Sequence, residues 1–153
     1  MNEITVIETP LDPEAEQLAF RRGRPASGAV VAFVGLMRDI NEGASVSAMF
    51  LEHYPGMTEK ALEKIVAEAK SRWAIDAVRV IHRVGELNPE DPIVLVAVAS
   101  CHRGDAFRAC EFVIDFLKTR APFWKREQTE AGAHWVDARE SDEAAQARWH
   151  SPS

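Results

Sequence analysis

Apolar positions along the chain follow two different spacings, and each spacing predicts a type of element. Ile4–Thr9 alternates between apolar and polar residues, as a half-buried strand does. Val30–Gly35 is apolar on both faces and rich in β-branched residues, so we predict a strand at the centre of a sheet. Ile93–Ser100 predicts a second buried strand, and further strands are expected at Val46–His53 and Val78–Val84.

Cap residues and apolar residues at helical spacing predict the helices. Asp12 is a favourable N-cap, Pro13 suits the first helical position, and Gly23 ends this short helix. Thr58 is expected to cap a second helix, whose apolar stripe continues to about Trp73. Both helices would therefore present one apolar face to a core.

The last third of the chain is expected to contain another helix and a pair of strands. Asp105 can cap a helix that ends near Arg120, because Pro122 disfavours helical backbone in the residue before it. The remaining predicted elements are two pairing strands, Trp124–Thr129 and His134–Val136, and a terminal helix from Ser141-Asp142 to Trp149.

The order of the predicted elements indicates the fold class. Strands and helices do not alternate strictly, which favours an α+β fold, a mixed or antiparallel sheet with packed helices. The polar stretch Met37–Ser45 is predicted as a loop. The length of 153 residues suits a single domain, residues 1–153, in which residues 149–153 would be a frayed tail.

Composition and charge narrow the range of functions. Hydrophobic residues make up 46% and charged residues 27%, and the net charge of −6 disfavours nonspecific binding to nucleic acid or to an anionic membrane. The longest apolar stretches, Val30–Met37 and Ile93–Cys101, are too short to span a bilayer. The first ten residues do not resemble a signal peptide, so a cytoplasmic location is expected. Cys101 and Cys110 fit no metal-binding spacing and are expected to be buried thiols.

Cations concentrate in one stretch of this acidic chain. Between Cys101 and Arg126, six basic and three acidic residues give a local charge of +3. His102 and Arg103 follow a predicted strand and precede a predicted helix, where backbone N–H groups and an arginine fork can bind an anion. A histidine packed at a strand end is the alternative. Scattered surface charge would also account for the composition.

Two lysines of this stretch are candidates for chemistry. Lys118 and Lys125 flank Phe123 and Trp124. Aromatic surroundings can desolvate a lysine, which makes its amine available as a base or nucleophile. A lysine that stays charged would instead hold a carboxylate or phosphate. A base-stacking platform for nucleic acid is a further interpretation, with weak support on a chain of this net charge.

Several strings resemble the family of the large, catalytic subunit of molybdopterin synthase. The resemblance extends from about Ile4 to Trp149, and LEHYPGMTE and LKTRAPFWKRE are its most specific parts. The strings that carry it are FVGLMRD (33–39), LEHYPGMTEKAL (51–62), VIHRVGEL (80–87), CHRGDAF (101–107), LKTRAPFWKRE (117–127) and WVDARESD (135–142).

The resemblance implies a fold, a reaction and partners. The family fold is an α/β hammerhead. Its members convert cyclic pyranopterin monophosphate into molybdopterin by inserting the two dithiolene sulfurs. The sulfur arrives as a thiocarboxylate on the C-terminal Gly-Gly of a small ubiquitin-like subunit. Two large subunits form a central homodimer within a heterotetramer. No cofactor or metal ion is expected.

The resemblance also implies site residues. Lys118 and Lys125 match the catalytic lysines, while Arg38, His102 and Arg103 suit the substrate phosphate. The full set of expected substrate contacts is Leu36, Met37, Arg38, His102, Arg103, Arg126 and Glu127, with Arg139 as a further candidate.

The spacing of these residues raises a geometric question. His102 and Lys118 lie sixteen residues apart on the predicted helix, which corresponds to roughly 20 to 24 Å. We therefore favour a site that two copies of the chain share. The alternative function is a noncatalytic anion-binding or scaffolding paralogue, and the presence of both lysines favours the enzyme.

Overall fold

The computed structural model describes residues 3–38, 40–41, 44–129, 132–136, 147 and 149, with side chains described outside 40–47 and 124–136. In these residues, none of the helices is both long and apolar enough to cross a membrane. In chain order the elements are β1 (Ile4–Ile7), α1 (Pro13–Arg21), β2 (Ala29–Leu36), β3 (Ile40–Asn41), β4 (Ala44–His53), α2 (Met57–Arg72), β5 (Ala77–Arg83), β6 (Gly85–Leu87), β7 (Pro92–Ser100), α3 (Arg103–Arg120), β8 (Phe123–Thr129) and β9 (Gly132–Val136).

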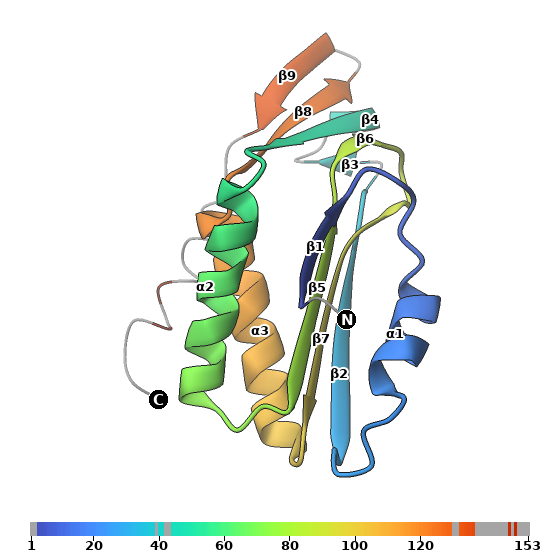
Figure 1. Cartoon of the computed structure of the whole chain (residues 1–153). Helices are drawn as coiled ribbons and strands as arrows, with labels where there is room; N and C mark the ends of the chain where they lie inside the picture. Colours follow the sequence, from blue (N-terminus) through green and yellow to red (C-terminus); the bar gives the residue numbers. More distant parts are fainter. Residues whose placement is uncertain are drawn as a thin grey trace.

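The first sheet has the strand order β1-β5-β7-β2 and lies between two layers of helix. α2 and α3 cover one face and α1 covers the other (Figure 1). β1 pairs with β5 in parallel, and the other two pairs are antiparallel. This mixed sheet with packed helices confirms the predicted α+β class.

β2 has the predicted residues and a different place in the sheet. It pairs with β7 on one side and is the last strand in the order, so the prediction of a central strand is wrong. The strand is apolar on both faces because each face is covered. Val31 and Phe33 pack against the core under α2 and α3, while Val34 packs on the opposite face. Apolar periodicity reports covered faces, and it carries no information about whether both edges of a strand are paired.

The larger core lies between the first sheet and α2 with α3. Leu62 of α2 and Phe112 of α3 are both 0% exposed, and they pack with the buried valines of β7. On the opposite face, Phe20 of α1 packs against Ala97 and Ala99. Two small side chains on β7 let α1 approach the sheet closely, so a nine-residue helix buries its phenylalanine almost completely.

A second sheet lies across the end of the first sheet. Its order is β3-β4-β8-β9, with β6 also paired to β4 (Figure 1). The predicted pairing of the two late strands is confirmed, with Lys125 opposite Val136. β3 and β6 were not expected. β3 turns part of the predicted loop after β2 into a short hairpin with β4, because Ile40 and Asn41 pair with Ser45 and Ala44.

Two helices begin at residues other than the predicted caps. α2 follows Gly56, whose backbone N–H donates to the Glu59 carboxylate at 2.5 Å, while the Thr58 hydroxyl donates to the Tyr54 carbonyl. α3 follows His102, which places Asp105 in the first turn rather than at the cap. An acidic side chain suits either position, because both face the positive end of the helix dipole.

Trp149 packs on the outer side of α2 and α3. Its ring meets the rings of Trp73 and Phe112, each with centroids 5.6 Å apart. Its indole N–H donates to the buried Asp115 carboxylate at 2.6 Å, and its carbonyl accepts from Arg72. Residues 141–146, 148 and 150–153, which belong to the predicted terminal helix and tail, lie outside the described residues.

Candidate active site

The two ends of α3 carry different groups of predicted site residues. His102 and Arg103 stand at its start and Lys118 stands in its last turn, and all three side chains are exposed. The helix is continuous from Arg103 to Arg120. At 1.5 Å per residue, the backbones of His102 and Lys118 are therefore about 24 Å apart along the helix axis. Within this chain, one small ligand cannot touch both ends.

The second sheet brings Lys125 close to the Lys118 end of α3. The helix ends at Arg120 as predicted, and Ala121 has extended backbone that directs the chain into β8. In β8, Lys125, Arg126 and Glu127 pair with Leu51, Phe50 and Met49 of β4. The side chains of these three β8 residues and all of Arg139 lie outside the described residues.

Two histidines hold the start of β8, and sequence analysis did not identify them. The Phe123 ring stacks on His82 with centroids 3.9 Å apart, and it lies 6.3 Å from the His53 ring. His82 is buried, and its Nδ1 lies 2.9 Å from the Arg83 carbonyl. These contacts fix the direction in which the chain leaves α3 and hence the position of Lys125. In the sequence the histidines come from separate strands, so their spacing gives no indication of a shared aromatic partner.

Leu36, Met37 and Arg38 lie at the same end of the molecule as Lys118. Met37 is 5% exposed and packs with Met49 and other buried residues next to the second sheet. Its buried side chain therefore anchors the exposed residues on either side of it. Its backbone N–H donates to Asp91 and its carbonyl accepts from Glu90. Leu36 and Arg38, on either side, are exposed. This end of the chain therefore presents an apolar side chain and two cations.

His102 and Arg103 lie at the opposite end, where β7 turns into α3. The His102 backbone N–H donates to the Ser100 hydroxyl at 3.3 Å, and the His102 side chain makes no capping hydrogen bond. The exposed His102 and Arg103 side chains flank the first turn of the helix. N–H groups at a helix start and an arginine fork are both suited to a phosphate.

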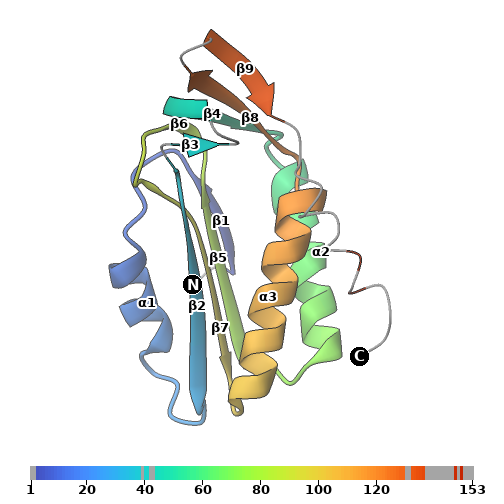
Figure 2. The ribbon, with the colours of Figure 1, turned by 180° about the vertical axis from the view of Figure 1, so that it is seen from behind.

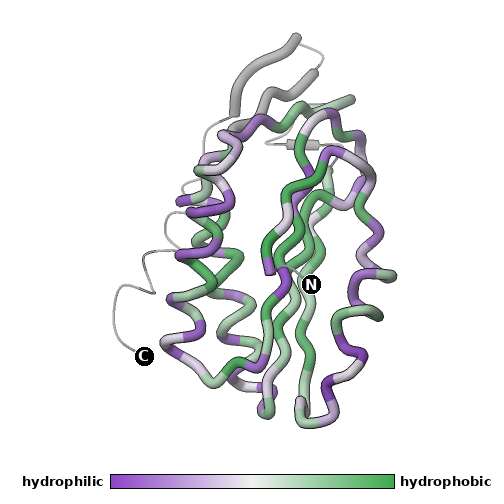
Figure 3. Tube along the Cα trace, in the orientation of Figure 1, coloured by the Kyte–Doolittle hydropathy of each residue, from purple (hydrophilic) through white to green (hydrophobic). Residues whose placement is uncertain are grey.

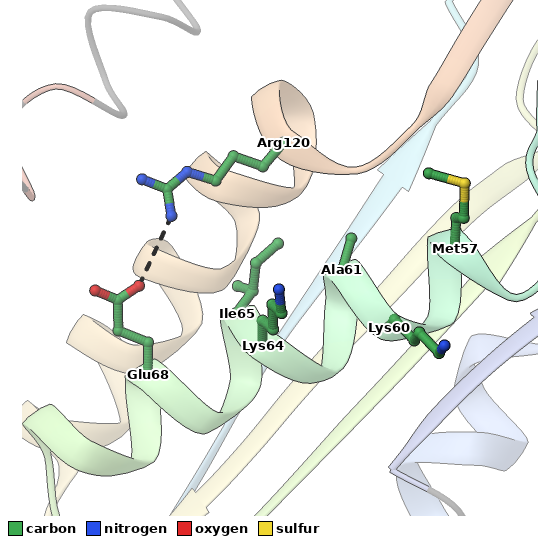
Figure 4. A pocket seen from close by; sticks show the side chains of 7 residues that line it. All are labelled: Met57, Lys60, Ala61, Lys64, Ile65, Glu68 and Arg120. Atoms are coloured by element: carbon green, nitrogen blue, oxygen red, sulfur yellow. Dashed lines mark ion pairs between the residues drawn. The ribbon is translucent and has the colours of Figure 1, made fainter.

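A groove of about 460 Å³ lies along α2, beside Arg120 at the end of α3 (Figure 4). Arg120 reaches across it to Glu68, with 3.9 Å between the charged atoms, and stacks on Phe116. None of the predicted site residues is among its lining residues, which are Met57, Lys60, Ala61, Lys64, Ile65, Glu68 and Arg120. In the described part of the chain, no three His, Cys, Asp or Glu side chains are grouped to hold a metal ion.

The two cysteines differ in environment. Cys110 is buried as predicted, and its thiol donates to the Val96 carbonyl. Burial, with a smaller contribution from the charge of Glu111, raises the pKa of the Cys110 thiol to about 12. Cys101 is exposed, so the prediction of a buried thiol is wrong there. The residue lies one position beyond β7, where the chain leaves the sheet.

Cys101→Ser is expected to retain full activity, because in the family that the sequence resembles the sulfur is delivered by a partner subunit. Thiol labelling of the folded wild-type chain near neutral pH should modify Cys101 and leave Cys110 unmodified, since a thiol with a raised pKa has little thiolate. Product assays and mass spectrometry of labelled peptides test both statements. An inactive but folded Cys101→Ser variant would show instead that the Cys101 thiol takes part in the reaction.

Comparison with known proteins identifies the family. The family model described as MoaE protein matches residues 6–120. The molybdopterin synthase catalytic subunit of Ralstonia nicotianae is 62% identical over 97% of this chain and 85% of that protein. The molybdopterin biosynthesis MoaE protein from Burkholderia ambifaria superposes with a TM-score of 0.82 at 56% identity, covering 99% of both chains.

A more distant structure shares the fold. It is a complex of subunits 1 and 2 of the molybdopterin-converting factor from Helicobacter pylori, with a TM-score of 0.76 at 21% identity, covering 90% of this chain and 92% of that one. The high identity and nearly complete coverage of the Ralstonia and Burkholderia proteins are decisive for the assignment. The chain belongs to the MoaE protein family.

Proposed function

We propose that this chain is the catalytic subunit of a molybdopterin synthase and acts in molybdenum cofactor biosynthesis. It converts cyclic pyranopterin monophosphate into molybdopterin, as a sulfurtransferase that takes sulfur from the C-terminal thiocarboxylate of a small ubiquitin-like subunit. The observation that carries the proposal is the position of Lys118 beside the start of β8, in a chain 62% identical to a named catalytic subunit.

The chemistry of sulfur transfer suits an exposed lysine at this end of the molecule. A thiocarboxylate tail carries negative charge, and the ammonium group of Lys118 can neutralise it without displacing core residues. Lys118 is the group next to the tail carbonyl. There it moves a proton as the sulfur bonds to the precursor and water replaces sulfur on the acyl carbon, so that the tail leaves as a carboxylate. Lys125 is its electrostatic partner.

The phosphate of the precursor is assigned to Arg38, His102 and Arg103. Arg38 lies at the Lys118 end, whereas the other two lie about 24 Å away along α3. A complete site therefore combines Arg38 and the lysines of one copy with His102 and Arg103 of the partner subunit. Leu36, Arg126, Glu127 and Arg139 complete the proposed substrate contacts, and Met37 supports them from the core.

Arg103→Ala is expected to weaken binding of the precursor by about 10- to 100-fold, the loss that removal of a charge-assisted hydrogen bond produces. Association with the small subunit should change much less. Calorimetric titration with the precursor and separately with the small subunit measures both. Rising salt should reduce precursor affinity of the wild type in the same direction. Equal affinity for a dephosphorylated precursor would contradict the phosphate assignment.

The second candidate is a noncatalytic anion-binding or scaffolding paralogue with the same fold. The presence of Arg38, His102, Arg103, Lys118 and Lys125 favours the enzyme. The deciding experiment mixes the chain with pterin precursor and a thiocarboxylated small subunit and measures dithiolene product. Product formation supports the synthase, whereas tight precursor binding without product would support the paralogue.

A further inference from the structure

Phe107 of α3 differs from the other phenylalanines of the described chain. It is 60% exposed, whereas Phe112 and Phe116 of the same helix are at most 1% exposed. Figure 3 shows that the strands of the first sheet are predominantly hydrophobic, and these two phenylalanines pack against them. Phe20 is buried on the opposite face of the sheet, and the remaining phenylalanines are partly buried. Phe107 is therefore the one phenylalanine with a solvent-facing ring in the part of the chain that the structure describes.

Neither core packing nor helix formation accounts for an aromatic residue at this position. Phe107 belongs to none of the hydrophobic clusters of the described residues, and within them its ring makes no aromatic or cation–π contact. Phenylalanine is also a weaker helix former than alanine or lysine, so helix propensity does not favour it at an exposed position. Single exposed apolar residues are common on protein surfaces. What distinguishes Phe107 is its place beside Arg103.

Arg103 and Phe107 are four residues apart in α3, so their side chains are neighbours on one face of the helix. One turn, about 6 Å along the helix axis, separates them. Side chains in a helix lean toward its start, which brings the Phe107 ring over the turn that carries Arg103. His102 is exposed directly before this turn, at the end of the molecule away from the second sheet (Figure 2). An apolar ring therefore lies next to the two side chains that are assigned to the precursor phosphate at this end.

The precursor has two parts that such a helix face would recognise. Its cyclic phosphate and its pterin ring lie at opposite ends of one rigid system of fused rings. When Arg103 holds the phosphate, the rigid rings fix how far away the pterin ring lies, and one helical turn is a comparable distance. The pterin ring is flat and has an exposed π-face, as a nucleobase has, and such rings stack on aromatic side chains.

We propose that Phe107 is a substrate-binding residue, whose ring stacks on the pterin ring while His102 and Arg103 hold the phosphate. This inference rests on the proposed function, because it takes the precursor as the ligand. The stacking adds a source of specificity that the charged residues lack. An arginine binds any accessible phosphate, whereas a stacking partner one turn away favours a phosphate that is attached to a flat heterocycle.

Calorimetric titration with the precursor, in the absence of the small subunit, tests the stacking. Phe107→Leu keeps an apolar side chain and removes the ring, so precursor affinity should fall about 10-fold, as it does when a stacked heterocycle loses its aromatic partner. Phe107→Tyr keeps the ring and should bind the precursor within about 2-fold of wild type. The matched control is Met57→Leu, at an apolar residue of α2 that is 63% exposed, and it should leave precursor affinity unchanged.

Titration with a pterin that has no phosphate separates the two parts of the ligand. Phe107→Leu should lower the affinity for this pterin by the same factor as for the precursor, because both ligands lose the stacking partner. Arg103→Ala should leave the affinity for this pterin unchanged, because the ligand has no phosphate for the guanidinium to bind. The reverse pattern would contradict the assignment of the ring to Phe107.

Two further results would overturn the proposal. One is a loss of affinity in Phe107→Tyr as large as that in Phe107→Leu. The other is a loss of affinity in Phe107→Leu that comes with altered sedimentation, which would assign the ring to a protein interface. Circular dichroism establishes that each variant is folded. A wild type that binds the precursor no better than Phe107→Leu would contradict only the stacking, whereas a wild type that binds no precursor would contradict the proposed function and the stacking together.

Discussion

Lys118→Ala is expected to lower product formation by about 10²- to 10⁴-fold, the usual contribution of a positioned proton carrier. The fold should be almost unaffected, because the side chain is exposed on the last turn of α3 and lies outside the core. We expect the free energy of unfolding to change by less than about 0.5 kcal/mol. Single-turnover formation of dithiolene product, with thiocarboxylated small subunit in excess, measures the effect.

Two further variants show what Lys118 contributes. Lys64→Ala removes an exposed lysine from the neighbouring helix and should leave turnover unchanged. Lys118→Arg keeps the positive charge with a group that does not release its proton, so it should preserve small-subunit binding while turnover stays low. Lys125→Ala should also lower turnover.

Near-normal turnover of Lys118→Ala would contradict the assignment of Lys118 as the proton carrier.

A mixture of Lys118→Ala and Arg103→Ala chains is expected to regain about a quarter of wild-type activity when the precursor concentration is too low to occupy the weakened Arg103→Ala site. After free exchange, half of the dimers are mixed, and in each mixed dimer one of the two composite sites has every residue intact. This expectation follows from the separation of about 24 Å along α3. Product formation after exchange measures recovery, and differently tagged chains establish that exchange has occurred.

The matched control mixes Lys118→Ala with Lys125→Ala. Both lysines belong to the same half-site, so each site of the mixed dimer lacks one of them and no activity should return. Absence of recovery in the Lys118→Ala and Arg103→Ala mixture, despite proven exchange, would place each complete site within one chain.

Local patterns in the sequence predicted the helices and strands well, but they predicted less well which strands pair with each other. The end of α3 at Arg120 follows from Pro122, because the proline ring restricts the residue before it. The place of β2 at the sheet edge depends on which distant strands pair, and periodicity does not encode that choice. The exposure of Cys101 likewise depends on where β7 leaves the sheet, one residue earlier.

The candidate site shows the same division between local and distant information. The residue types suggest the chemistry of the site, a base or nucleophile for Lys118 and anion binding for His102 and Arg103. The helix between them fixes their separation. The stacking of His82 on Phe123 was unpredictable, because it joins strands that are forty residues apart in the sequence. A family resemblance identifies the positions of the site residues. It does not indicate which of two copies of the chain contributes each residue to a shared site.

Trp149 gives the molecule an internal optical probe. Its indole ring is nearly perpendicular to that of Trp73, at 86° with centroids 5.6 Å apart. Two indole transitions at that distance couple and produce a characteristic pair of circular dichroism bands of opposite sign in the ultraviolet. The signal depends on the seating of Trp149 on α2 and α3, so it reports whether the C-terminal end is docked while substrate or partner is added elsewhere on the protein.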